Sequence, residues 1–205
     1  MDENLRAELL RRAAVDQTAR NALDPEAMEQ ADAQNLPWLK EMIADHGWPG
    51  RSAVGEDGAA AAWLLVQHAD RDPAFQRECL GLLTAAADAD EATKAHVAYL
   101  TDRVLLAEGH PQEYGTQVTG RDRQWVPRSL RDPDRVDERR AQMMLGPLAD
   151  YLAHFAEQGQ PPPISIRCPH CGERVDFWPP DTGDESAAEC GGCRREIRIR
   201  LESPA

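Results

Sequence analysis

Two pairs of cysteines near the C-terminal end constrain the fold of this chain most strongly. Each pair has the spacing Cys-x2-Cys and 18 residues separate the pairs, whose members are Cys168, Cys171, Cys190 and Cys193. This spacing is typical of a zinc ribbon, because each pair forms a turn that directs two thiolates to one point, and Zn²⁺ prefers a tetrahedron of such ligands. We therefore predict one structural zinc ion per chain, held by these four residues.

Two alternatives concern the first pair and the metal. Cys168-Pro169-His170-Cys171 has the same letters as the active site of thiol oxidases resembling DsbA. That site requires a helix that begins at its first cysteine, whereas a strand-like run follows here and a second cysteine pair is present. Iron in the same four-thiolate site is the other alternative. Four thiolates leave no open coordination position, so we expect a structural rather than a catalytic metal.

The cysteines lie in a small module that begins after a proline-rich segment. Apolar and polar residues alternate over 164–166, 174–178 and 196–201, which predicts short strands around the cysteines. Consecutive prolines favour an extended, stiff chain, so 159–163 is predicted to be a linker. The predicted organisation is a domain over 1–158, this linker, and a zinc ribbon over 164–205.

The segment before the linker has the spacing of helices. Apolar residues recur every three or four positions, and Asp24, Asp57 and Asp72 are suited to cap helix N-termini. We predict about six helices, over 2–20, from 25 to 46, from 57 to 68, from 73 onward, over 90–108 and over 134–155, the last bent at Gly146-Pro147. Residues 112–128 are expected to form a hairpin or an ordered loop. The fold class is mainly α, a single helical domain followed by a small β zinc ribbon.

Charge and hydropathy limit the partners. The formal net charge is −13, and binding to a phosphate backbone requires the opposite sign, so nucleic acid is an improbable partner. The most apolar stretch, 59–66, is far shorter than the roughly 20 residues that cross a bilayer, so we expect no membrane span. The N-terminal residues are acidic rather than basic and apolar, unlike a secretory signal. We expect a cytoplasmic protein.

Five short motifs resemble those of a bacterial, often actinobacterial, family known only as a domain of unknown function. The motifs are Gly47-Trp48-Pro49-Gly50, Gln67-His68-Ala69-Asp70, Asp102-Arg103, Tyr114-Gly115-Thr116-Gln117, and Arg139-Arg140 ahead of Leu145-Gly146. The resemblance covers roughly residues 5–155. It implies a coherent domain and marks a set of polar positions, but the family has no assigned reaction and many of its members lack the ribbon.

These polar positions have two interpretations. Buried polar groups must be satisfied, so they can form a structural network that bridges helices and loops. Alternatively they line a pocket, in which His68 is the general acid or base and Asp102 fixes its tautomer. The residues predicted to bind a substrate or a developing oxyanion are Arg103, Gln67, Gln112, Tyr114, Thr116 and Gln117.

Two functions from different classes follow from these interpretations. The pocket predicts a hydrolase or a group-transfer enzyme that acts on a small polar or peptide substrate. The alternative is a non-catalytic adaptor or regulatory protein whose ribbon binds a protein or nucleic-acid partner. Arg198 and Arg200 share one face of the last predicted strand and are candidates for such a contact. A solvated strand face explains them more simply, because an acidic loop balances their charge; its acidic residues are Asp181, Asp184, Glu185 and Glu189.

Overall fold

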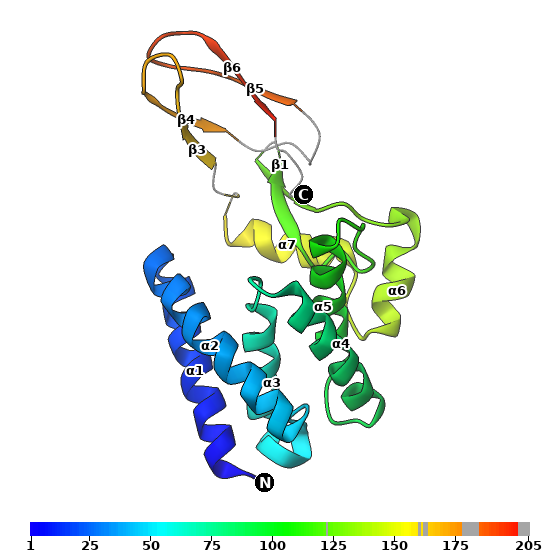
Figure 1. Ribbon diagram of the computed structural model, residues 1–205. Coiled ribbons are helices and arrows are strands. Elements are labelled where there is room, and N and C mark those ends of the chain that lie inside the picture. Colours follow the sequence, from blue (N-terminus) through cyan, green and yellow to red (C-terminus); the bar gives the residue numbers. More distant parts are fainter. Residues whose placement is uncertain (122, 160, 162–163, 178–184, 201–205) are drawn as a thin grey trace. The chain divides into compact units, whose positions relative to one another are not determined.

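The computed structural model describes residues 1–121, 123–159, 161, 164–177 and 185–200 (Figure 1). The chain divides into two compact units, Met1–Ala107 and Glu108–Ala205, which are described separately below. Helices dominate, and the strand pairs of the C-terminal region surround the four cysteines, which confirms the predicted fold class. The domain boundary at residue 158 stays a prediction, and linker residues 160, 162 and 163 lie outside the described part.

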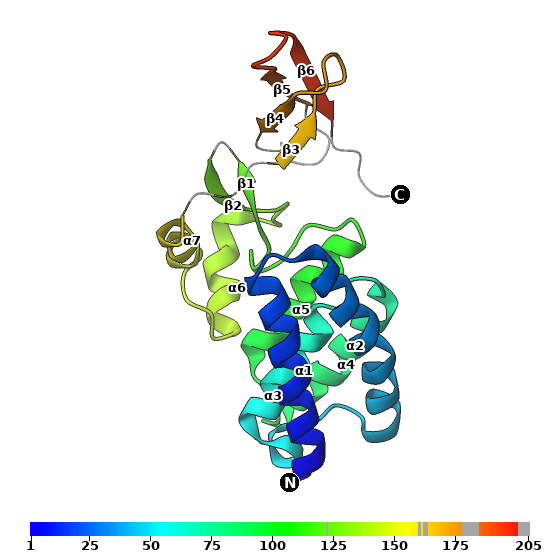
Figure 2. The ribbon, with the colours of Figure 1, turned by 90° about the vertical axis from the view of Figure 1, so that its left-hand side faces the viewer.

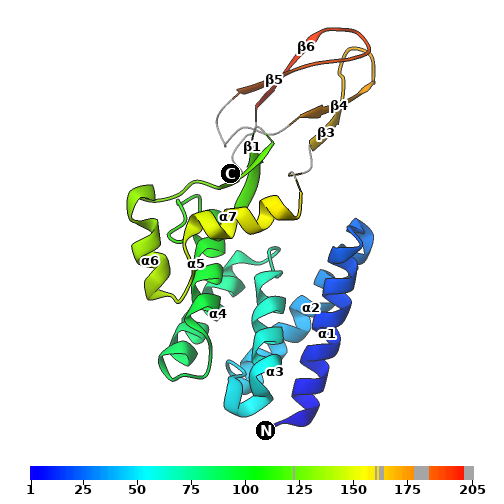
Figure 3. The same cartoon turned by 180° about the vertical axis from the view of Figure 1, so that it is seen from behind.

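The first unit consists of five helices. They are α1 (Glu3–Asn21), α2 (Pro25–His46), α3 (Arg51–Gln67), α4 (Pro73–Asp88) and α5 (Lys94–Ala107). In Figures 1 and 3, α1 and α2 form an antiparallel hairpin, and Figure 2 shows α1 in front of α3. The most extensive helix contacts join α1 to α3, α4 to α5, and α1 to α2.

Aspartates cap the start of three of these helices, and two of these caps, Asp24 and Asp72, were predicted from the sequence. The side chain of Asp2 accepts from the Leu5 amide at 2.9 Å, and Asp24 accepts from two amides of the first turn of α2 at 3.1 Å. Asp72 accepts from the Phe75 amide at 2.9 Å. Each bond satisfies an amide that has no partner within its own helix, which fixes where the helix begins.

The third helix begins earlier than predicted. Its first turn starts at Arg51, where the Glu91 carboxylate accepts from the Ser52 amide at 2.8 Å. Gly55 then interrupts the helix with φ 76° and ψ 169°, a conformation that glycine tolerates. The predicted cap, Asp57, follows this kink, accepts from the Gly58 amide at 2.8 Å and pairs with Arg6. The prediction therefore located the kink rather than the start of the helix.

The core of the first unit is built from the apolar faces of its helices. Fully buried aliphatic side chains from all five helices meet there, and they include Leu9, Leu39, Val54, Leu65, Val66, Leu83 and Leu100. Burying each such side chain contributes about 1.5–3 kcal/mol. None of the helices in the described part of the chain is long and apolar enough to cross a membrane.

The second unit begins with a hairpin and two short helices. Strands β1 (Val118–Arg121) and β2 (Gln124–Pro127) pair antiparallel, which is the predicted hairpin. After the 3₁₀ turn η1 (Pro133–Arg135) come α6 (Val136–Gln142) and α7 (Leu148–Glu157). The prediction of one bent helix over 134–155 is wrong, because Met144 adopts φ 58° and Pro147, which has no amide hydrogen, stands at the start of a new helix.

The ribbon contains two antiparallel strand pairs in its described residues. Strand β3 (Ile164–Arg167) pairs with β4 (Arg174–Phe177), and β5 (Glu185–Glu189) pairs with β6 (Glu196–Arg200). Three of these strands were predicted, but β5 was expected to belong to an acidic loop, of which Asp181 and Asp184 lie outside the described residues. Between the pairs, the buried Val175 and Ile197 pack with Cys168 and Cys190.

Candidate functional site

The four cysteines converge on one point. Their sulfur atoms all lie within 4.8 Å of one another, with Cys168 Sγ 3.7 Å from Cys193 Sγ and Cys171 Sγ 3.5 Å from Cys190 Sγ. A tetrahedral zinc site with Zn–S bonds of about 2.3 Å has S–S edges of about 3.8 Å, so the spacing fits a four-thiolate metal centre. Among the described residues, no other group of histidine, cysteine or acidic side chains meets in this way.

The two cysteine turns repeat the same backbone path. In the first, the Cys168 amide donates to the Glu173 carbonyl at 2.7 Å and the Gly172 amide donates back to Cys168 at 2.9 Å. In the second, Cys190 and Arg195 form the matching bond at 3.0 Å, and Arg194 donates to Cys190 at 2.8 Å.

Gly172 and Arg194 occupy the same place in the two turns and both have a positive φ, 77° and 57°. Only glycine adopts this conformation without cost, so the second turn is the more strained of the two. Cys168 directly follows strand β3 and begins a turn, whereas a thiol-oxidase site requires a helix that begins at its first cysteine. The structural basis for a thiol-oxidase site is therefore missing.

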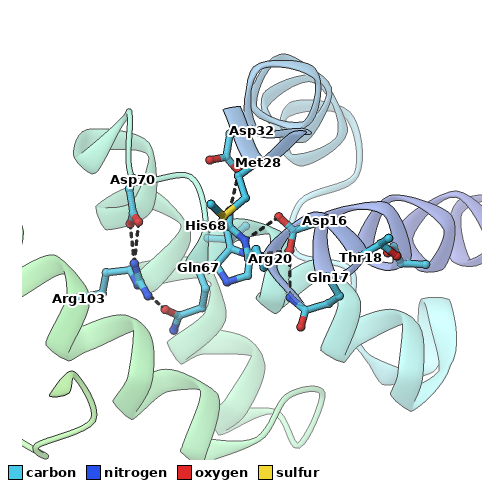
Figure 4. A network of polar contacts seen from close by, with 12 residues as sticks. Asp16, Gln17, Thr18, Arg20, Met28, Asp32, Gln67, His68, Asp70 and Arg103 are labelled. Carbon is cyan, nitrogen blue, oxygen red and sulfur yellow. Dashed lines mark hydrogen bonds and ion pairs between the residues drawn. The ribbon is translucent and has the colours of Figure 1, made fainter. Parts of the chain in front are cut away.

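His68 lies at the C-terminal end of α3 and is held by a carboxylate from α1. Its Nδ1 is 2.7 Å from Asp16 Oδ2, and the Asp16 side chain is only 1% exposed (Figure 4). A carboxylate at Nδ1 retains the proton there, so Nε2 is the ring atom that can accept or release a proton. The predicted role of Asp102 as the carboxylate that fixes this tautomer is filled by Asp16, whereas Asp102 is fully buried within α5.

Asp16 stays charged because several donors surround it. Arg20 Nε lies 3.0 Å from Oδ1, and Gln17 Nε2 donates to Oδ2 at 3.0 Å. Burial alone would raise the pKa of Asp16, but the hydrogen bond and charge of His68 and the contacts with Gln17 and Arg20 outweigh it, so the pKa is lowered. Arg20 also reaches Asp32 on α2 at 2.6 Å, so the network connects three helices.

Arg103 is occupied by protein groups rather than free to grip a substrate. Its Nη1 donates to both oxygens of Asp70 at 2.8 and 2.7 Å, and its Nε donates to Gln67 Oε1 at 2.7 Å. The predicted contact between this guanidinium and a substrate carboxylate or phosphate therefore competes with an existing ion pair. Gln76, which the sequence did not indicate, donates to Asp70 and to two carbonyls at the end of α3, each at 3.1 Å.

In the second unit, Gln112, which was predicted to bind a substrate, forms hydrogen bonds that hold a loop in place. Its Nε2 donates to the carbonyls of Gln117 and Arg128 at 2.9 and 3.0 Å, and its Oε1 accepts from the Gln117 amide at 3.0 Å. The residue is fully buried, so these bonds satisfy an amide that would otherwise be costly to bury. Gln117 in turn donates from Nε2 to Thr116 Oγ1 at 3.2 Å.

The backbone of the same loop is held by two side chains from the following helices. Arg140 Nη1 donates to the Tyr114 carbonyl at 2.7 Å, and the Tyr151 hydroxyl donates to the Thr116 carbonyl at 2.9 Å. Gly115 between them has φ 68°, and a Cβ there would lie 3.0 Å from Leu148 Cδ1. The described contacts of this loop thus favour the structural interpretation of its motif over the oxyanion site.

A surface hollow of about 530 Å³ lies elsewhere, between α1 and α2. It is lined mainly by small side chains, among them Ala14, Val15, Thr18, Ala22, Ala27 and Gln34. None of the residues predicted from the sequence to bind a substrate lines this hollow.

Asp16 is the main residue that the sequence interpretation missed, although a signal was present. Leu9, Ala13, Asp16 and Arg20 follow one another at spacings of four, three and four residues, which places them on one face of α1. Leu9 and Ala13 are buried apolar residues, so the sequence places the Asp16 carboxylate on the buried face of the helix. A buried carboxylate requires a hydrogen-bonding partner.

Comparison with known proteins identifies a family but no activity. Neither the curated proteins nor the solved structures contain a match to this chain. The model of a family of unknown function, DUF6624, matches residues 3–159, which include all five helices of the first unit and the hairpin and helices of the second. The match ends before Cys168, so the four-cysteine centre lies outside the matched segment. The chain therefore belongs to the DUF6624 family.

Proposed function

We propose that the four-cysteine centre binds one structural Zn²⁺ per chain. The equal path of the two turns and the S–S spacing near that of a zinc tetrahedron support this metal. Purified protein should contain about one equivalent of zinc and little iron by elemental analysis. A protein with iron as the main metal would contradict the choice of zinc.

We propose further that the first unit carries an enzyme of the hydrolase or group-transfer class, which acts on a small polar or peptide substrate. The observation that carries this proposal is the Asp16–His68 hydrogen bond at 2.7 Å. It supports a role for His68 Nε2 as the general base that takes a proton from an attacking hydroxyl or water and returns it to the leaving group. Asp16 stabilises the imidazolium that forms between these steps, and such acid–base catalysis contributes roughly 10²–10⁴ in rate.

Replacing His68 by alanine tests this proposal. Turnover is measured with three chromogenic probes, a p-nitrophenyl ester, a p-nitrophenyl phosphate and a peptide p-nitroanilide. We expect one of these activities to fall by at least about 10² in His68→Ala while the helical circular dichroism signal is retained. His110→Ala is the matched control, because His110 is an exposed histidine of the second unit. Equal activity of the two variants would refute a catalytic role for His68.

The alternative is an adaptor whose ribbon binds a protein partner. The exposed arginines Arg194 and Arg195 of the second cysteine turn favour it, since two adjacent exposed cations suit an acidic partner surface. The chain's negative charge still opposes a nucleic-acid partner. We also propose a cytoplasmic location, because a reducing compartment keeps four free thiols available to the metal. A double variant with Arg194→Glu and Arg195→Glu that keeps full turnover but no longer binds a protein partner would favour the adaptor.

A further inference from the structure

The side-chain amide of Gln67 carries a donor without an acceptor. Its Nε2 is buried and has no hydrogen-bond partner among the described residues, and the whole residue is 4% exposed. The orientation of the amide is fixed, because Oε1 accepts from Arg103 Nε at 2.7 Å. A flipped amide would set two donors against each other, so the unpaired atom is the nitrogen.

An unpaired buried donor is rare in a folded protein. About nine in ten buried polar groups have a partner, and leaving one unmet costs about 1–3 kcal/mol. Gln67 is also the residue immediately before His68, and both project from the end of α3 (Figure 4). Because Asp16 occupies His68 Nδ1, the unmet donor of Gln67 and the proton-accepting Nε2 of His68 belong to adjacent residues.

The charges around this donor favour a neutral acceptor over an anion. Three carboxylates, those of Asp16, Asp32 and Asp70, belong to the network, against the two guanidiniums of Arg20 and Arg103. Burial raises the pKa of Asp32; the charges of Arg20 and His68 oppose this rise and those of Asp16 and Asp70 add to it. A carboxylate or phosphate ligand would add to this negative charge.

We propose that Gln67 Nε2 is a substrate-binding donor that receives the carbonyl oxygen of a neutral amide group. This assignment deepens, and rests on, the proposed function of His68, because it names the substrate class that the same site takes. The Arg103–Asp70 ion pair stands beside the donor, and its side chains are 26% and 58% exposed. Exposed pairs contribute only about 0–1 kcal/mol, so moving Asp70 away from Arg103 to admit a ligand costs little and leaves the bond from Arg103 Nε to Gln67 Oε1 in place.

The test uses the full chain labelled with ¹⁵N and N-methylacetamide as the probe. We expect the side-chain NH₂ resonances of Gln67 to shift and to saturate as the probe is added. Gln67→Glu keeps the oxygen that Arg103 requires but removes the donor, so its affinity for the probe should fall by about tenfold. Gln142→Glu is the matched control, because it makes the same charge change at an exposed position and should bind like the wild type.

Two results would overturn the inference. One is tighter binding of acetate or inorganic phosphate than of N-methylacetamide, since the site would then select an anion. The other is an unchanged Gln67 resonance, or equal binding by Gln67→Glu. His68→Ala separates this inference from the proposed function: probe binding should persist in that variant even where turnover is lost. Retained binding together with unaffected turnover would refute the catalytic role of His68 alone.

Discussion

Substituting Asp16 with asparagine removes one negative charge from the buried face of α1 while it preserves the size of the side chain. In the native protein this charge balances Arg20 at 3.0 Å and bonds to His68 at 2.7 Å. Breaking a fully buried ion pair costs about 3–5 kcal/mol. Arg20 is partly exposed and keeps its contact with Asp32, so we expect a smaller loss, about 2–3 kcal/mol in the free energy of unfolding.

Urea unfolding followed by circular dichroism measures this loss, and its pH dependence identifies the cause. The pKa of Asp16 is lowered by folding, so its stabilising contribution is complete above the unfolded-state value of 3.8 and disappears as the pH falls through the lower folded-state value. The difference between wild type and Asp16→Asn should therefore be full at pH 7 and shrink below about pH 4.

Glu29→Gln is the matched control, because Glu29 forms an ion pair with Arg71 in which both side chains are more than half exposed. Such a pair contributes about 0–1 kcal/mol, so this variant should unfold almost like the wild type. If Asp16→Asn lost no more stability than Glu29→Gln at pH 7, the view of Asp16 as the balanced buried charge of the first unit would be refuted.

Three further predictions concern other parts of the chain. Burial lowers the pKa of His96, which stacks on Trp63, from 6.5 to about 4, so the wild type should lose up to about 3 kcal/mol as the pH falls from 6.5 to 4. His96→Phe should remove this loss in urea unfolding at the two pH values. Gly115→Ala should lower stability by about 1–3 kcal/mol, because its φ is positive and the new Cβ meets Leu148, and a melting curve tests this. Cys190→Ser should lose the bound metal by elemental analysis but retain the helical signal.

Features set by neighbours in the sequence could be predicted. An N-cap aspartate bonds to an amide two or three residues away, so Asp24 and Asp72 indicated their helix starts without tertiary information. The two Cys-x2-Cys turns are equally local, and their spacing sufficed to bring the sulfur atoms together. The break at Met144 escaped prediction, because the pattern there allowed a bent helix as well as two short ones.

The sequence could not show which side chains form hydrogen bonds with each other when they are far apart along the chain. Asp16 and His68 are 52 residues apart, and only the packing of α1 against α3 brings them together. Asp102 was an equally reasonable partner, since nothing in the sequence says which carboxylate faces the end of α3. Gln112 shows the same limit, because its residue type cannot distinguish a ligand donor from a buried brace of three loop hydrogen bonds.

The hydrogen bonds of the predicted binding residues limit which side-chain atoms of the first unit can contact a substrate. Arg103, the apparent anion grip, has its Nε and Nη1 occupied by Gln67 and Asp70. A guanidinium that is already neutralised serves poorly as the recognition element for a second anion. Among the described residues, the buried amide nitrogen of Gln67 has no hydrogen-bond partner, and the residue next to it, His68, has its Nδ1 held by Asp16. In the proposed site, Gln67 would donate to the carbonyl oxygen of a substrate and His68 Nε2 would exchange a proton, which is the pair of functions that activation of a carbonyl group requires.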